Sequence, residues 1–284
     1  MAIKEVLNNF LFKLSRNTLK RNESLKEGLD DSCYIIGTGS SIRNLDLSKF
    51  NDHPVILINW AFIHTGTKNL NIDALVLPEP FILSPLIRKH WKRSPTVNRK
   101  RKAVLAYLSK IPINIPILIS LTNILFFRRK NIYFAYHFDS RNCDIKKLDI
   151  ASRYSFMAGG LYSAIGLALN KGYENLKLIG CDYLIKSSKI KIPTGHFYTK
   201  SDFVQMRKYK FIKNPYEDLF AQLKKTNVNI SLISGYPDKD VSVFCEKEPY
   251  ENYRDKLLPN LVNRKSIVDK EFADFLADVH LLHE

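Results

Sequence analysis

The chain has 284 residues, and its 45% hydrophobic and 12% aromatic content suits a large globular domain with a buried core. Its 44 Lys and Arg residues exceed its 28 Asp and Glu residues by 16, which predicts an anionic partner: a membrane surface, a nucleic acid or an acidic small molecule. The four cysteines form no C-x-x-C pair, which argues against a disulfide scaffold and indicates reduced thiols in a cytosolic protein.

Residues 1–31 are predicted to form an amphipathic helix followed by a polar linker. Charges interrupt the first 20 residues, so no cleavable signal peptide is expected there. Basic residues accompany the apolar ones, a pattern typical of a helix that lies on an anionic membrane. Packing on the protein's own domain or on a partner subunit is the alternative. The apolar side chains of this helix are Val6, Phe10, Leu11, Phe12 and Leu14.

From residue 32 to residue 245, short apolar strands alternate with helical patterns. This alternation predicts an α/β domain with a Rossmann-like, mostly parallel sheet that is flanked by helices. The expected strands are 33–36, 55–59, 73–77, 133–136, 176–181 and 229–234, and the expected helices are 158–170 and 215–226.

Residues 84–130 interrupt this alternation and are dense in Lys and Arg, which predicts an inserted, basic, mostly helical subregion or lid. The apolar run 111–127 contains two prolines and is expected to be buried or part of the lid, not to span a membrane. No nucleic-acid-binding motif accompanies the Arg-rich clusters, so a solvated or membrane-facing surface is favoured. Residues 246–284 are predicted to be a helical tail with a terminal amphipathic helix at 272–282.

Two glycine-bearing turns follow predicted strands. One is Gly37-Thr38-Gly39-Ser40-Ser41, and the other is Gly180-Cys181-Asp182. A glycine turn after a strand lets a phosphate or nucleotide approach the backbone, and open α/β sheets bind ligands at this edge. The pair therefore predicts a ligand site, with tight turns that bind nothing as the alternative.

Other motifs narrow the chemistry. The chain has no P-loop, no G-x-S-x-G elbow and no H-E-x-x-H, and its first turn lacks the third glycine of a dinucleotide fingerprint. The pair Asp238 and Asp240 is interpreted as a solvated turn, so no metal site is predicted. His196 follows the fifth predicted strand, and its imidazole could accept a proton from a hydroxyl. A loop histidine bonded to the backbone is the alternative.

The order and spacing of these motifs resemble the bacterial sialyltransferases of glycosyltransferase family 42, and more distantly motility accessory factor-like glycosyltransferases. The resemblance covers roughly residues 33–235. The motifs that carry it are Gly37-x-Gly39-x-Ser41, Asn59, Gly159-Gly160-Leu161-Tyr162, Gly172-Tyr173, Gly180-x-Asp182 and Gly195-His196.

The resemblance implies an inverting, metal-independent transferase that moves a sialic-acid-like sugar, a nonulosonate, from a CMP-activated donor to a glycan acceptor. The product would be a bacterial surface polysaccharide or lipooligosaccharide. No cofactor is implied, because the CMP-sugar is a substrate. Residues 32–245 would be the nucleotide-sugar-binding domain.

The resemblance also implies site residues. His196 falls on the general base, Asn59 should contact the nucleotide, and Asp182 should lie near the ribose. The family's two phosphate-binding tyrosines have no clean match, so Tyr183, Tyr198, Lys186 or Lys191 would stabilise the leaving phosphate. The donor-binding residues that the resemblance implies are Gly37, Thr38, Gly39, Ser41, Asn59, Gly159, Gly160, Gly180 and Asp182.

A basic cleft suits an anionic donor and also suits docking on an anionic membrane. We therefore expect a cytoplasmic protein, peripheral on the inner face of the inner membrane, with no nucleic-acid partner; a homo-oligomer is left open. Alternatives within the enzyme class are a transferase of Kdo or another keto-sugar acid and a protein-glycosylating transferase of the motility-accessory type. Alternatives outside it are a non-catalytic membrane-bound scaffold and, from charge alone, a nucleic-acid-binding protein.

Overall fold

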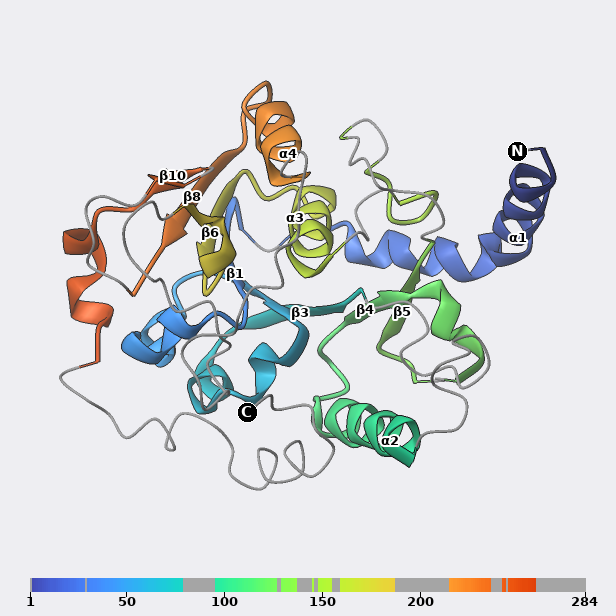
Figure 1. Cartoon of the computed structure of the whole chain (residues 1–284), viewed down its shortest axis with the longest axis horizontal. Helices are drawn as coiled ribbons and strands as arrows, with labels where there is room; N and C mark the ends of the chain where they lie inside the picture. Colours follow the sequence, from blue (N-terminus) through green and yellow to red (C-terminus); the bar gives the residue numbers. More distant parts are fainter. Residues whose placement is uncertain are drawn as a thin grey trace.

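A computed structural model of the chain contains an eight-stranded, all-parallel sheet with helices on both faces (Figure 1). This architecture confirms the predicted Rossmann-like α/β fold. The residues that the structure describes are 2–28, 30–78, 95–126, 129–136, 145, 148–154, 159–186, 215–235, 242–243 and 245–258.

The strand order is β10-β8-β6-β1-β2-β3-β4-β5. Strands β1 to β5 follow one another in one direction, and β6, β8 and β10 extend the sheet in the other, so the order reverses between β1 and β6. The strands of this sheet are β1 (Ser32–Ile36), β2 (Val55–Ile58), β3 (Ile72–Leu77), β4 (Ile117–Ser120), β5 (Ile132–Ala135), β6 (Asn175–Ile179), β8 (Asn229–Ile233) and β10 (Glu246–Lys247). A separate antiparallel pair joins β7 (Ile185–Lys186) to β9 (Ser242–Val243).

Helices cover both faces of the sheet, and alternate residues of β1 show the two cores. Cys33 and Ile35 pack with α3 (Gly160–Asn170) and α4 (Pro215–Leu223), whereas Tyr34 and Ile36 belong to the core under α2 (Pro95–Lys110). A further helix, α1 (Ala2–Lys20), lies beside β5. The 3-10 segments are η1 (Arg21–Leu25), η2 (Ser40–Asn44), η3 (Leu47–Lys49), η4 (Asn59–Ile63), η5 (Thr65–Asn69), η6 (Leu121–Phe126), η8 (Asp182–Leu184) and η9 (Tyr250–Lys256).

Strand β4 corrects the interpretation of 84–130 as an insertion. Its four residues are all buried, and they pair with β3 on one side and β5 on the other. A strand buried on both faces has a continuous apolar sequence, and the apolar run 111–127 contains such a strand. In its described part the region is a helix-and-strand crossover, α2 followed by β4. No helix in the described parts of the chain is long and apolar enough to cross a membrane.

Helix α3 fills the core beneath the candidate site. Its residues 161–168 are all buried, and a Schellman motif ends it at Gly172, whose φ is +85°. The amide of Gly172 bonds to the carbonyl of Leu169, and the amide of Tyr173 bonds to that of Ala168. The pair Gly172-Tyr173 therefore has a local structural role in terminating α3.

Both predicted domain boundaries fall within packed structure. In the segment assigned as a linker, the buried Asn22 amide donates to the carbonyls of Phe134 at 2.8 Å and Ile150 at 2.7 Å. At the other boundary, the predicted helical tail begins as strand β10, which pairs with β8, and η9 buries Tyr253. The terminal helix predicted at 272–282 lies outside the described residues.

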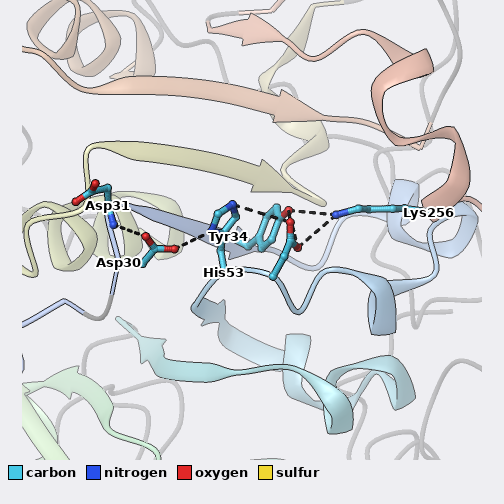
Figure 2. A network of polar contacts seen from close by, with 6 residues as sticks. Asp30, Asp31, Tyr34, His53 and Lys256 are labelled. Carbon is cyan, nitrogen blue, oxygen red and sulfur yellow. Dashed lines mark hydrogen bonds and ion pairs between the residues drawn. The ribbon is translucent and has the colours of Figure 1, made fainter.

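A polar network ties η9 to the amino edge of the sheet (Figure 2). The Tyr34 hydroxyl donates to Asp52 at 3.1 Å, the ammonium of Lys256 lies 3.3 Å from the same carboxylate, and His53 Nδ1 lies 2.8 Å from Asp30. Although partial burial raises the pKa of Asp52, its backbone hydrogen bond and Lys256 lower it below the ordinary value overall. Asp30 precedes β1, and Asp52 and His53 precede β2, so the network lies at the opposite edge from the predicted ligand site.

Candidate functional site

The two predicted glycine turns meet at the carboxyl edge of the sheet, where the strand order reverses. The amide of Gly37 donates to the carbonyl of Ile179 at 2.7 Å, and the amide of Gly39 donates to that of Gly180 at 2.8 Å. In open α/β sheets the crevice at this switch point is where ligands bind. The turn after β1 and the turn after β6 are thus hydrogen-bonded to each other at the position that the fold favours for a ligand.

Contact between the two turns explains why glycine is required in both. A Cβ at Gly37 would lie 2.6 Å from the carbonyl oxygen of Gly180, and one at Gly39 would lie 2.5 Å from a carboxylate oxygen of Asp182. Gly180 itself has a φ of +65°, a left-handed conformation that glycine adopts without steric cost. These glycines therefore have a packing role that does not depend on a ligand.

Asp182 fastens the two turns together. Its carboxylate is 3% exposed, and it accepts hydrogen bonds from the Ser41 amide at 2.8 Å, from the Ser41 hydroxyl and from the Ser40 hydroxyl at 3.5 Å. Burial raises the pKa of Asp182 to about 6, and the hydrogen bonds from Ser41 oppose that rise. Asp182 is thus a buried clamp in this structure, and its contact with a ribose stays a prediction.

Asn59 carries the strongest local sign of a binding role. It follows β2 with a φ of +51°, and among the described residues it is the one non-glycine residue with a positive φ. Its side-chain Oδ1 is buried and has no hydrogen-bond partner within the described part of the chain. A buried acceptor without a donor costs stability, so a donor from a ligand would satisfy it.

The N-terminus of α3 lies beside Asn59. A Cβ at Gly160 would come within 2.4 Å of an Ile58 methyl and 3.3 Å of the Asn59 amide nitrogen, so glycine allows the close approach. At Gly159, by contrast, the nearest atom would be 3.8 Å away, in the ring of Tyr162. Among the described residues, no side chain caps the N-terminus of α3, a position that favours an anion, and Gly160 there adjoins the side-chain amide nitrogen of Asn59.

The predicted donor-binding residues divide into two layers at this edge. Those in the outer layer are partly exposed and can meet a ligand, whereas those in the inner layer are buried and hold the turns in place. The outer residues are Thr38, Gly39, Asn59, Gly159 and Gly160, and the inner residues are Gly37, Ser41, Gly180 and Asp182.

The chain has no significant match among protein-family models, curated proteins or solved structures.

The predicted catalytic groups are not placed by the structure. His196, Tyr198 and Lys191 lie outside the described residues, and so does the pair Asp238 and Asp240. Tyr183 directly follows Asp182 within η8, and Lys186 lies in β7. The structure describes only the backbone of these two residues. Within the described ranges, no cluster of three or more His, Cys, Asp or Glu side chains could hold a metal ion.

Tyr107 is a residue of this site that no sequence motif marks. It comes from α2, and its hydroxyl donates to the backbone carbonyl of Asn59 at 2.8 Å, while its ring packs against Trp60 with centroids 4.5 Å apart. Tyr107 thus holds the backbone of the left-handed turn at Asn59 from the α2 side of the sheet. It also lines a cavity of about 470 Å³ that includes His64 and Lys68, on the α2 side of the sheet.

Proposed function

We propose that this chain is a glycosyltransferase that moves a nonulosonate from a CMP-activated donor to a glycan acceptor, with inversion and without a metal ion. The observation that carries the proposal is the unsatisfied Oδ1 of Asn59, whose left-handed turn adjoins Gly160 at the N-terminus of α3. It adds to the motif resemblance a physical reason for ligand binding at this edge.

The arrangement suits both the nucleotide and the phosphate-linked sugar of a nucleotide-sugar donor. Asn59 would accept a hydrogen bond from an N–H or O–H group of the nucleotide, and the backbone at Gly159 and Gly160 would let the base approach. Thr38 and Gly39 would lie against the phosphate and the sugar. The leaving phosphate carries negative charge, which nearby amides and cationic side chains offset, so the proposed reaction needs no metal ion.

The reaction itself is a single displacement. The oxygen of an acceptor hydroxyl attacks the anomeric carbon of the donor, and the bond from that carbon to the phosphate oxygen breaks. CMP leaves with the bonding electron pair, and the hydroxyl proton passes to His196, the general base that the resemblance implies. Tyr183 and Tyr198 remain candidates for stabilising the departing phosphate.

The charge of the chain favours a location near anionic lipid. A net charge of +16 attracts the chain to an anionic membrane surface, where lipid-linked glycans present acceptor hydroxyls. The proposal therefore includes peripheral association with the inner face of the inner membrane.

A donor screen tests this function directly. The chain is incubated with CMP-Neu5Ac, CMP-Kdo, CMP-legionaminate or CMP-pseudaminate, and release of CMP is measured with and without excess EDTA. We expect one or more of these donors to release CMP at a rate that EDTA leaves unchanged. Activity that EDTA abolishes and Mg²⁺ or Mn²⁺ restores would contradict the metal-independent mechanism. Failure of every donor would favour the non-catalytic scaffold.

A further inference from the structure

Helix α1 uses only one of its faces to pack against the protein. The ring of Phe12 meets that of Tyr136 edge-on at 5.1 Å, and the guanidinium of Arg153 lies 4.9 Å from the centre of the Phe12 ring. Ser15 and Leu19, one and two turns further on, are buried. These contacts fix the rotation of α1 about its axis and so determine which side chains point away from the domain.

A second apolar stripe lies on the outward face. Val6, Phe10 and Leu14 follow one another at intervals of one helical turn and are 68%, 56% and 66% exposed. The sequence pattern groups them with Leu11 and Phe12, but those two residues are only partly exposed, and Phe12 packs on the domain. The structure therefore divides the predicted apolar face into a packed face and an open one.

Basic side chains accompany the open stripe. Lys13, Arg16 and Lys20 are all exposed, and no acidic residue occurs between Val6 and Arg21. Pairing of two copies through this stripe would bring their cationic side chains together, and like charges across an interface disfavour association. An anionic surface complements both the apolar stripe and its charges.

The C-terminal end of α1 continues this surface onto the domain. There, Thr18 and Arg21 line a groove of about 630 Å³ together with Leu125 and Lys130. Leu125, in η6, is 77% exposed, and Lys130 is exposed as well. Figure 1 shows α1 beside β5, projecting past that edge of the sheet. Apolar and basic side chains from two separate parts of the chain therefore meet at this groove, next to the end of α1.

We propose that the open face of α1, formed by Val6, Phe10 and Leu14 and extended by Leu125, docks on an anionic phospholipid bilayer. The helix lies in the plane of the membrane, its apolar side chains enter the boundary between headgroups and acyl chains, and its basic side chains contact the headgroups. This contact specifies the membrane association that the proposed function includes, but it does not depend on transferase activity.

Vesicle flotation tests the docking face. The 284-residue chain is mixed with vesicles of phosphatidylcholine alone or of phosphatidylcholine with phosphatidylglycerol, at low and high salt. We expect binding to the anionic vesicles that weakens at high salt. A double variant, Phe10→Ser with Leu14→Ser, should lower the partition coefficient at least about tenfold, because two apolar side chains no longer enter the lipid.

The matched control is Ile113→Ser. Ile113 is 55% exposed but lies after α2, outside both α1 and the groove, so this variant should bind like wild type. Circular dichroism and thermal melting should be unchanged in all variants, because the substituted side chains are exposed. Equal binding to neutral vesicles, or an unaffected double variant, would overturn the proposal. The proposal would also be overturned if the wild type were a dimer that does not bind lipid and the double variant were a monomer. Donor turnover is measured separately, so failure of the docking face is distinguishable from failure of the proposed reaction.

Discussion

Replacing His196 with alanine is expected to lower the rate of sugar transfer by about 10²–10⁴-fold, the usual contribution of a general base. The affinity for CMP should stay nearly unchanged, because in the proposed reaction the base acts on the acceptor hydroxyl and not on the nucleotide. An imidazole loses its basicity when protonated, so transfer by the wild type should decline at acidic pH. The variant should lack that acidic limb of the pH–rate profile.

His53→Ala is the matched control for this prediction. His53 is a partly exposed histidine whose Nδ1 lies 2.8 Å from Asp30 (Figure 2). It precedes β2, so it lies at the amino edge of the sheet, opposite the candidate site. Its loss should leave transfer unchanged. Near wild-type transfer by His196→Ala, with the fold intact, would mean that another group accepts the proton.

The second largest expected effect is a loss of folding stability when the Asp182 carboxylate, which joins the two turns, is removed. At about pH 4, where Asp182 makes most of its pH-dependent contribution, Asp182→Ala should lower the free energy of unfolding by about 3 kcal/mol, because the buried amide and hydroxyl of Ser41 lose their acceptor. CMP binding should weaken with it, since the turn that carries Gly39 is no longer held. The matched control is Asp52→Ala, which removes a 52% exposed carboxylate and should cost no more than about 1 kcal/mol. Chemical denaturation measures both changes, and equal costs would contradict the clamp.

The clamp also predicts a pH dependence of stability. The pKa of Asp182 is about 6 in the folded chain, against an ordinary value of 3.8, so folding favours its protonated form. Its contribution to stability is therefore greatest below the ordinary value and is lost as the pH rises through 6, by up to about 3 kcal/mol. Asp182→Asn cannot titrate, so the difference in unfolding free energy between wild type and variant should fall between about pH 4 and pH 6.5. A constant difference would mean that the carboxylate is not buried.

The paired turns could be predicted from the sequence because each consists of local signals. Gly37 and Gly39 follow one apolar strand and Gly180 follows another, and parallel strands bring such turns to the same edge of the sheet. The sequence does not separate strand β4, because its residues lie within a longer apolar run, 111–127, whose periodicity does not distinguish a buried strand from a buried helix.

The chemistry of the edge depends on contacts between distant residues. Asp182 is a clamp because Ser41 lies against it, and the turn of Asn59 is supported by Tyr107 from a helix that sequence reasoning assigned to an insertion. Neither contact has a local motif. The two faces of α1 likewise depend on what Phe12 packs against, which the apolar spacing alone does not determine.

Titration calorimetry with CMP tests the central claim most directly, on the wild type and on Asn59→Gly. We expect the wild type to bind CMP and the variant to bind it about tenfold more weakly, because one hydrogen bond to the nucleotide is lost. The variant should be as stable as the wild type or more so, since glycine adopts the left-handed turn without strain and the unsatisfied amide oxygen is gone. A wild type that does not bind CMP, or a variant that binds it undiminished, would contradict the assignment of this edge as a CMP-sugar site.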